Sequence, residues 1–134
     1  MSAEKVNPPE LYDSVQYGFS HAARHRGGSL VHLAGQVAWD KDGKLVGPDD
    51  LGAQTRQALA NLRAVLASVG ASTDDIVRLR TYVVNHTPEK LGPVLGEIAQ
   101  FYGKELPAPN TFIGVSALAL PEFLVEIEAT AVVD

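Results

Sequence analysis

The chain has 134 residues, enough for one domain with its own hydrophobic core and too few for a second. It contains no cysteine, which excludes disulfides, iron–sulfur clusters, thiolate zinc sites and thiol nucleophiles. The 11 basic and 16 acidic residues give a net charge of −5, the wrong sign for binding a phosphate backbone. We therefore expect a single domain, residues 1–134, that does not bind nucleic acid.

The N-terminal segment carries charged residues early and has no apolar stretch that would serve as a secretory signal or a membrane span. We therefore expect a cytoplasmic protein without membrane contact. Asn7, Pro8 and Pro9 favour an extended backbone, so residues 1–16 are predicted to form an extended arm.

Strands are the first regular elements that the sequence predicts. Residues 20–26 and 29–39 have the composition and alternation of strands, and Gly27 and Gly28 between them indicate a hairpin. Gly35 lies inside the second strand, where a missing side chain is typical of a bulge or of a close approach by a ligand or another backbone.

Helix and strand alternate in the middle of the chain. Apolar residues spaced by three and four predict an amphipathic helix over residues 49–69. Residues 76–84 alternate with the period of a strand. Thr87 and Pro88 suit the cap and the first position of a second helix, which is expected to end at Gly103.

Two strands, residues 111–118 and 124–133, complete an order that predicts an α+β fold with both helices on one face of a sheet. The opposite face has no helix to cover it, and a homo-oligomer would bury it. The charged fraction of 20%, below the roughly 25% usual for soluble domains, agrees with a buried surface. The apolar residues expected on that face are Leu30, Ile76, Tyr82 and Phe112.

Histidines are the first candidates for a site. His21 and His25 have the spacing of a metal-binding pair, but no third ligand is near in sequence, and ordinary hydrogen-bonded histidines are the alternative. We expect no metal site. His32 precedes Gly35 by three positions, which makes it a candidate binding residue; a partly buried polar side chain is the alternative.

Two glutamates are the next candidates. Glu126 and Glu128 lie two apart on one face of the last strand, a spacing that suits general acid and base chemistry. Cross-strand ion pairs with Arg78 and Arg80 are the alternative. The sequence has no nucleotide-binding glycine loop, so we expect no cofactor.

Three segments of the sequence resemble one known family. They are Gly35-Gln36 in the second strand, the glutamines and asparagine at 54, 57 and 61 in the first helix, and PAPNT (107–111) followed by LVEIEATA (124–131). From about Tyr17 to its end the chain is similar to the reactive intermediate deaminase family, also called RidA, YjgF or endoribonuclease L-PSP.

The resemblance implies a chorismate-mutase-like α+β fold and a homotrimer with a small-molecule cleft at each subunit interface. Well-known members of the family hydrolyse enamines and imines, such as 2-aminoacrylate, to 2-keto acids and ammonia. The partners implied are therefore further copies of the chain and a small molecule bound between them.

The resemblance also implies an altered cleft. Glu126 matches the glutamate that positions water, and Gly35 matches a glycine that borders the cleft. Asn110 stands where the family has an arginine that binds the substrate carboxylate, Phe19 where it has a tyrosine, and Ala34 where it has a serine. An amide cannot replace the arginine, whose loss weakens carboxylate binding by roughly 30- to 1,000-fold. A contact from Arg24, Arg78 or Arg80, reaching the cleft from another direction, is the alternative.

Two functions follow from this pattern. The first is a hydrolase that deaminates an enamine- or imine-type metabolite, in which Glu126 is catalytic, Asn110 bonds a neutral polar group and Phe19 forms an apolar wall. The second is a non-catalytic trimer that binds a small molecule. A ribonuclease is least favoured, because the acidic chain has no basic stripe.

Overall fold

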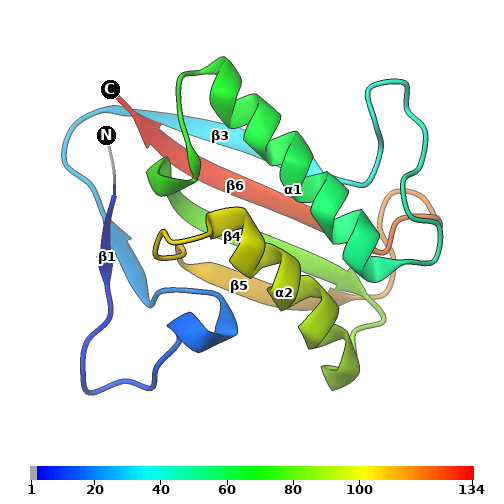
Figure 1. Ribbon diagram of the computed structural model, residues 1–134, viewed down its shortest axis with the longest axis horizontal. Helices are drawn as coiled ribbons and strands as arrows, with labels where there is room; N and C mark the ends of the chain where they lie inside the picture. Colours follow the sequence, from blue (N-terminus) through cyan, green and yellow to red (C-terminus); the bar gives the residue numbers. More distant parts are fainter. Residues whose placement is uncertain (1–2) are drawn as a thin grey trace.

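The computed structural model describes residues 3–134, which form a four-stranded sheet covered by two helices. The sheet has the strand order β3-β6-β4-β5, and a second sheet of β1 and β2 lies beside it (Figure 1). The strands are β1 Glu4–Val6, β2 Ala22–Arg24, β3 Ser29–Gln36, β4 Ile76–Val84, β5 Asn110–Val115 and β6 Val125–Val133. The helices are α1 Leu51–Ser68 and α2 Leu91–Tyr102, with short 3-10 helices η1 Val15–Tyr17, η2 Thr73–Asp75 and η3 Pro88–Lys90.

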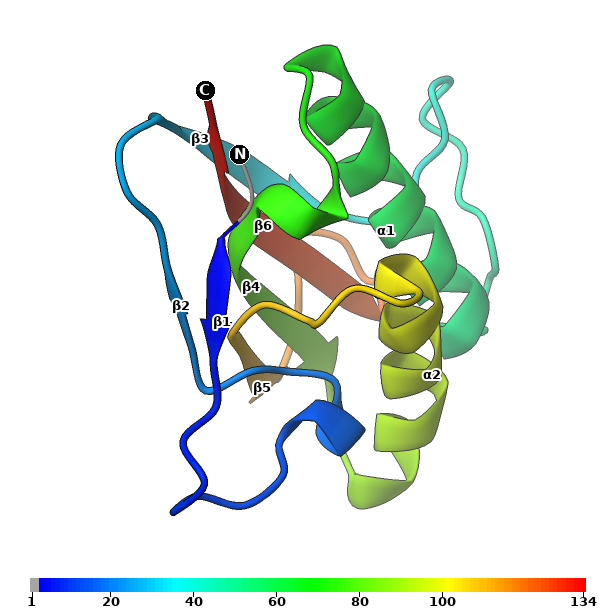
Figure 2. The ribbon, with the colours of Figure 1, turned by 60° about the vertical axis from the view of Figure 1, so that its left-hand side comes forward.

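The helices serve as crossovers between parallel strands. Both β3 and β4 run antiparallel to β6 and therefore parallel to each other, and β5 runs parallel to β4. Parallel neighbours need a long connection, which α1 supplies between β3 and β4 and α2 supplies between β4 and β5. Both helices lie on the same side of the sheet (Figure 2). The predicted α+β fold is confirmed.

The core lies between the helices and the sheet. Every second residue of β6 points under the helices and is buried, whereas Glu126, Glu128 and Thr130 lie on the other side, which we call the open face. The side chains with no exposed surface in this core include Leu62, Leu66, Leu79, Val83, Ile98 and Ile127.

Among residues 3–134, neither α1 nor α2 has the length and apolar composition that a membrane-spanning helix needs.

The predicted hairpin of the first two strands is wrong. β2 pairs with β1 instead, and Arg24 of β2 bonds Glu4 of β1 at 2.7 Å. β3 pairs with β6, which is 9 residues long and offers mostly apolar partners, with Ser29 opposite Val133. The predicted extended arm likewise contains β1 and η1; its first two residues lie outside the described part.

The open face differs in composition from the prediction. Ile76 has no exposed surface, because the register shifts between Ile76 and Arg78 and turns its side chain toward the helices. Phe112 is also on the helix side, packed against the core. Leu30, 54% exposed, and Tyr82 do lie on the open face. By alternation, further apolar residues of this face are Val84, Ile113 and Val115.

Candidate functional site

The candidate residues divide into two groups that line no common pocket. Phe19 and Asn110 line a cavity of about 420 Å³ between η1, α2 and the beginning of β5, which we call the aromatic pocket. Gly35 and Glu126 lie on the open face, where β3 and β6 pair. The walls of the aromatic pocket include Tyr12, Tyr17, Phe19, Leu95, Asn110 and Phe112.

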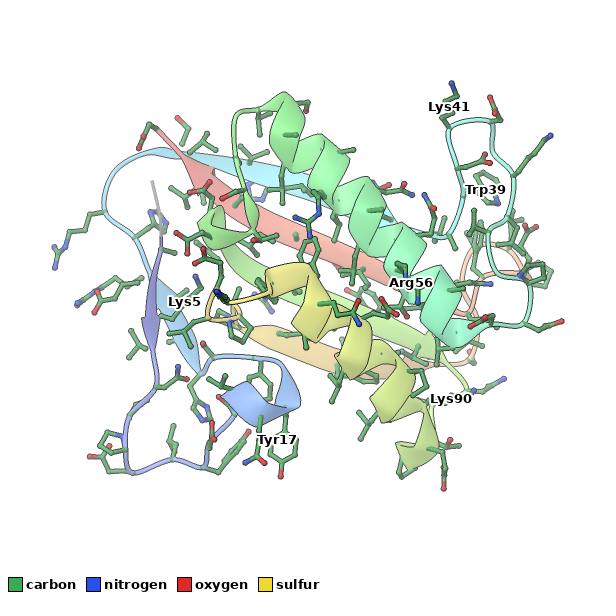
Figure 3. The ribbon with its side chains drawn as sticks, in the orientation of Figure 1. Lys5, Tyr17, Trp39, Lys41, Arg56 and Lys90 are labelled. Carbon is green, nitrogen blue, oxygen red and sulfur yellow. The ribbon has the colours of Figure 1, made fainter. Side chains whose placement is uncertain are left out.

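The aromatic wall is built by the segment that precedes β2. The ring of Tyr12 contacts Phe19 and Tyr17 edge to face, with centroids 6.3 and 6.4 Å apart. His21 Nε2 lies 2.9 Å from the carbonyl of Tyr12, and Asn7 Oδ1 accepts from His21 N at 2.9 Å. These bonds close the segment into a loop. The 3-10 helix η1 of this segment carries Tyr17 and lies below the beginning of β5 in the view of Figure 3.

Asn110 is the first residue of β5, and its amide is held in one orientation. The hydroxyl of Thr81, which has no exposed surface, donates to Asn110 Oδ1 at 3.2 Å. With its oxygen occupied, the amide presents Nδ2 as a donor, and no described residue accepts a hydrogen bond from it. No charged side chain is among the described residues that line the pocket. The pocket therefore offers a neutral donor within apolar walls.

Glu126 lies against the backbone of Gly35. The pairing of β3 with β6 shifts register between Leu33 and Gln36, which confirms the bulge predicted at Gly35. A Cβ at Gly35 would lie 2.8 Å from Cδ of Glu126, so any other residue here would displace the Glu126 side chain from its position. Within residues 3–134, Glu126 has no hydrogen-bond or ion-pair partner, so its carboxylate oxygens are available to accept a hydrogen bond from water or a ligand.

Glu128 has a different environment from Glu126. The phenol of Tyr82 donates a hydrogen bond to Glu128, and this bond raises the pKa of Tyr82. Arg80 lies opposite Glu128 in the β4 to β6 register, yet neither glutamate forms an ion pair among the described residues. The cross-strand ion pairs considered as the alternative are therefore wrong.

The remaining sequence candidates lie apart from the aromatic pocket. His32 and Ala34 are exposed on the open face, with His32 opposite Thr130 of β6. His25 Nδ1 lies 3.2 Å from the carbonyl of Gly27, and His21 is bonded to Tyr12, so each makes a local contact. Residues 3–134 contain no group of three potential metal ligands among their His, Asp and Glu side chains.

Gln54 has a structural role that the sequence reasoning missed. Its side chain has no exposed surface, and Nε2 donates to the carbonyls of Gly47 and Glu122, both at 3.1 Å. Its Oε1 accepts from Leu124 N at 2.9 Å. These bonds attach the chain just before β6 to α1 and so fix the entry of the strand that carries Glu126. A polar residue on the apolar side of a helix was the available signal.

The side chain of Asn61 attaches the loop after β3 to α1. Its Nδ2 donates to the carbonyls of Val37 and Trp39, both at 3.0 Å, and its Oδ1 accepts from Gln57 at 2.9 Å. The family-like pattern of α1 is thus explained by hydrogen bonds to the loops that frame the open face, and none of these residues touches the aromatic pocket.

One chain does not bring Glu126 to Asn110. Glu126 is opposite Tyr82 in β4, and Tyr82 is opposite Ile113, three residues beyond Asn110 in β5. Glu126 is on the open face, whereas Asn110 bonds Thr81 on the helix side. A site that uses both residues therefore needs two copies of the chain.

Comparisons with known proteins agree on one family. Residues 14–133 match the family described as Endoribonuclease L-PSP. A RutC family protein of Pyrococcus horikoshii is 33% identical over 109 residues, covering 79% of this chain and 81% of its own. The crystal structure of YyfB, a Rid family protein of unknown function from Yersinia pestis, is 55% identical, with a TM-score of 0.96 over 99% of this chain and 100% of that one. A YjgF family member from Mycobacterium tuberculosis is 35% identical, with a TM-score of 0.65 over 98% and 100% of the two chains.

Proposed function

Because this chain belongs to the endoribonuclease L-PSP family, which is also the RidA or YjgF family, we propose that it hydrolyses the C=N bond of a small enamine- or imine-type metabolite. The observation that carries the proposal is the carboxylate of Glu126, which lies over the Gly35 backbone and has no partner among the described residues. Its substrate would be a reactive metabolite of the cytoplasm.

The chemistry needs one base and water. Glu126 takes a proton from water while the oxygen attacks the imine carbon, and the C=N π electrons move to nitrogen, which receives that proton back from Glu126. Glu126 then takes the hydroxyl proton of the resulting carbinolamine and passes it to nitrogen, so that the C–N bond breaks, the C=O bond forms and ammonia leaves. An imine and water thus become a carbonyl compound and ammonia, without any oxidant or cofactor. An enamine first takes a proton on carbon and loses one from nitrogen, which converts it to the imine.

The proposed site is assembled between copies of a homotrimer. The aromatic pocket of one copy supplies Asn110 and Phe19. The open face of the next copy supplies Glu126 and Gly35, together with Ala34 and His32 of β3. Apolar side chains on the open face support this arrangement, because a monomer would leave them in water.

We expect gel filtration with light scattering to report three copies for the wild-type protein. Ile113→Glu is expected to shift the protein to monomers, since it places a charge among the apolar side chains of the open face. The matched control is Ala60→Glu on the exposed side of α1, which should remain trimeric. A wild-type monomer would contradict the shared site.

The activity test generates 2-imino acids with an amino-acid oxidase and a neutral imine separately, then follows the loss of each C=N bond. We expect the wild type to speed hydrolysis of the neutral imine, and Asn110→Arg to raise turnover of 2-imino acids by about 30-fold or more, because a guanidinium binds their carboxylate. Absence of acceleration by both proteins would overturn the proposal. Ligand-dependent stabilisation without ammonia release would instead support the non-catalytic binding protein.

A further inference from the structure

The residues that line the aromatic pocket indicate which class of ligand it can bind. Its described lining residues are aromatic, aliphatic or neutral polar, and none is charged. A carboxylate that enters this pocket loses hydration without gaining a cation from the residues that line it in one chain, which is unfavourable. The part of the shared site that this pocket supplies therefore favours an uncharged ligand. This inference rests on the proposed function, because it concerns the substrate class of the same site.

The orientation of Asn110 specifies which neutral group the pocket recognises. Thr81 donates to Asn110 Oδ1 at 3.2 Å, and Thr81 has no exposed surface. If the amide turned, Nδ2 would donate to this hydroxyl and leave its buried O–H without an acceptor, which is unfavourable. In the observed orientation, Nδ2 donates into the pocket. A carbonyl oxygen of an amide, ester or ketone is the matching acceptor.

The size and walls of the pocket specify the rest of the ligand. The cavity of about 420 Å³ is well above the roughly 150 Å³ that holds a benzene molecule in a protein interior. Tyr12 and Phe19 of the segment before β2 and Phe112 of β5 line the pocket with aromatic rings, on which a ligand ring can stack or which it can meet edge to face. We propose that the pocket binds an imine or enamine that carries an aromatic ring and, in place of a carboxylate, an uncharged carbonyl group bonded by Asn110.

The test compares three unreactive probes by isothermal titration calorimetry with the full-length wild type. Phenylacetamide has the ring and the amide, phenylacetate replaces the amide by a carboxylate, and acetamide has no ring. We expect phenylacetamide to bind at least about 10-fold more tightly than either of the others. Equal or tighter binding of phenylacetate overturns the inference, and so does the absence of binding by phenylacetamide.

Variants of Asn110 and Thr81 test whether the hydrogen bond between them positions the Asn110 amide for ligand binding. Asn110→Asp keeps the shape and removes the donor, so the Kd for phenylacetamide should rise by about 10- to 100-fold. Thr81→Val should raise this Kd by about 3- to 10-fold, because the amide is no longer held in one orientation, while Thr81→Ser restores the hydroxyl and the affinity. If Thr81→Val and Thr81→Ser bind phenylacetamide equally, the orienting bond is not used.

The binding test and the turnover test can give opposite results, so the inference about the pocket and the proposed function can be refuted independently. Preference for phenylacetamide without ammonia release from any imine would refute the hydrolase and leave the selectivity of the pocket intact. Hydrolysis of 2-imino acids by the wild type, together with tighter binding of phenylacetate, would refute the selectivity and leave the hydrolase.

Discussion

Replacing Glu126 by glutamine is expected to lower kcat for imine hydrolysis by about 10²- to 10⁴-fold, the usual contribution of a general base. Glutamine keeps the size of the side chain and its position over Gly35, but it cannot accept a proton from water. Since Glu126 has no bonded partner among the described residues, the substitution removes no stabilising contact. Steady-state kinetics should show an unchanged KM, and the melting temperature should stay close to that of the wild type.

Glu128→Gln is the matched control for this prediction. It makes the same chemical change two residues away on the same face, at a side chain that accepts from Tyr82. Its kcat should remain within a few-fold of the wild type. Equal activities of Glu126→Gln and the wild type, or an equal loss in the two variants, would exclude Glu126 as the specific base.

Gln54→Leu is expected to lower the free energy of unfolding by about 2 to 5 kcal/mol, with a fall in melting temperature of roughly 10 to 20 °C. The new side chain fits an apolar site but makes no hydrogen bonds. It leaves two backbone carbonyls and the N–H of Leu124 without the partner that Gln54 provides. Urea denaturation followed by circular dichroism measures the change.

Gln57→Leu is the control for this second prediction. Gln57 lies on the same helix, is only half-buried and bonds Asn61 alone, so its loss should cost about 1 kcal/mol or less. If Gln54→Leu were as stable as Gln57→Leu, the loop before β6 would not depend on α1. We also expect Gln54→Leu to reduce kcat, because Leu124 lies two residues before Glu126.

Local patterns predicted several features of the site and fold. The strand at residues 76–84 was predicted with its observed bounds, and the helix at 49–69 begins and ends within two residues of α1. A bulge at Gly35 was one of two structures that the glycine inside an apolar strand indicated, the other being a close approach by a ligand or another backbone, and the register shift between Leu33 and Gln36 confirms the bulge. Each of these signals lies within a few residues of the feature that it predicts.

The helices, most of the main-sheet strands and the family could thus be predicted from local residue patterns, which also singled out Glu126, Gly35 and Asn110. The pairing of β2 with β1 could not, because competition among strands depends on partners far away in the chain. Tertiary structure decided this pairing and the register shift that buries Ile76. Only the fold could show that Thr81 orients Asn110 and that Glu126 lies on another face, since these relations arise when β4, β5 and β6 pair.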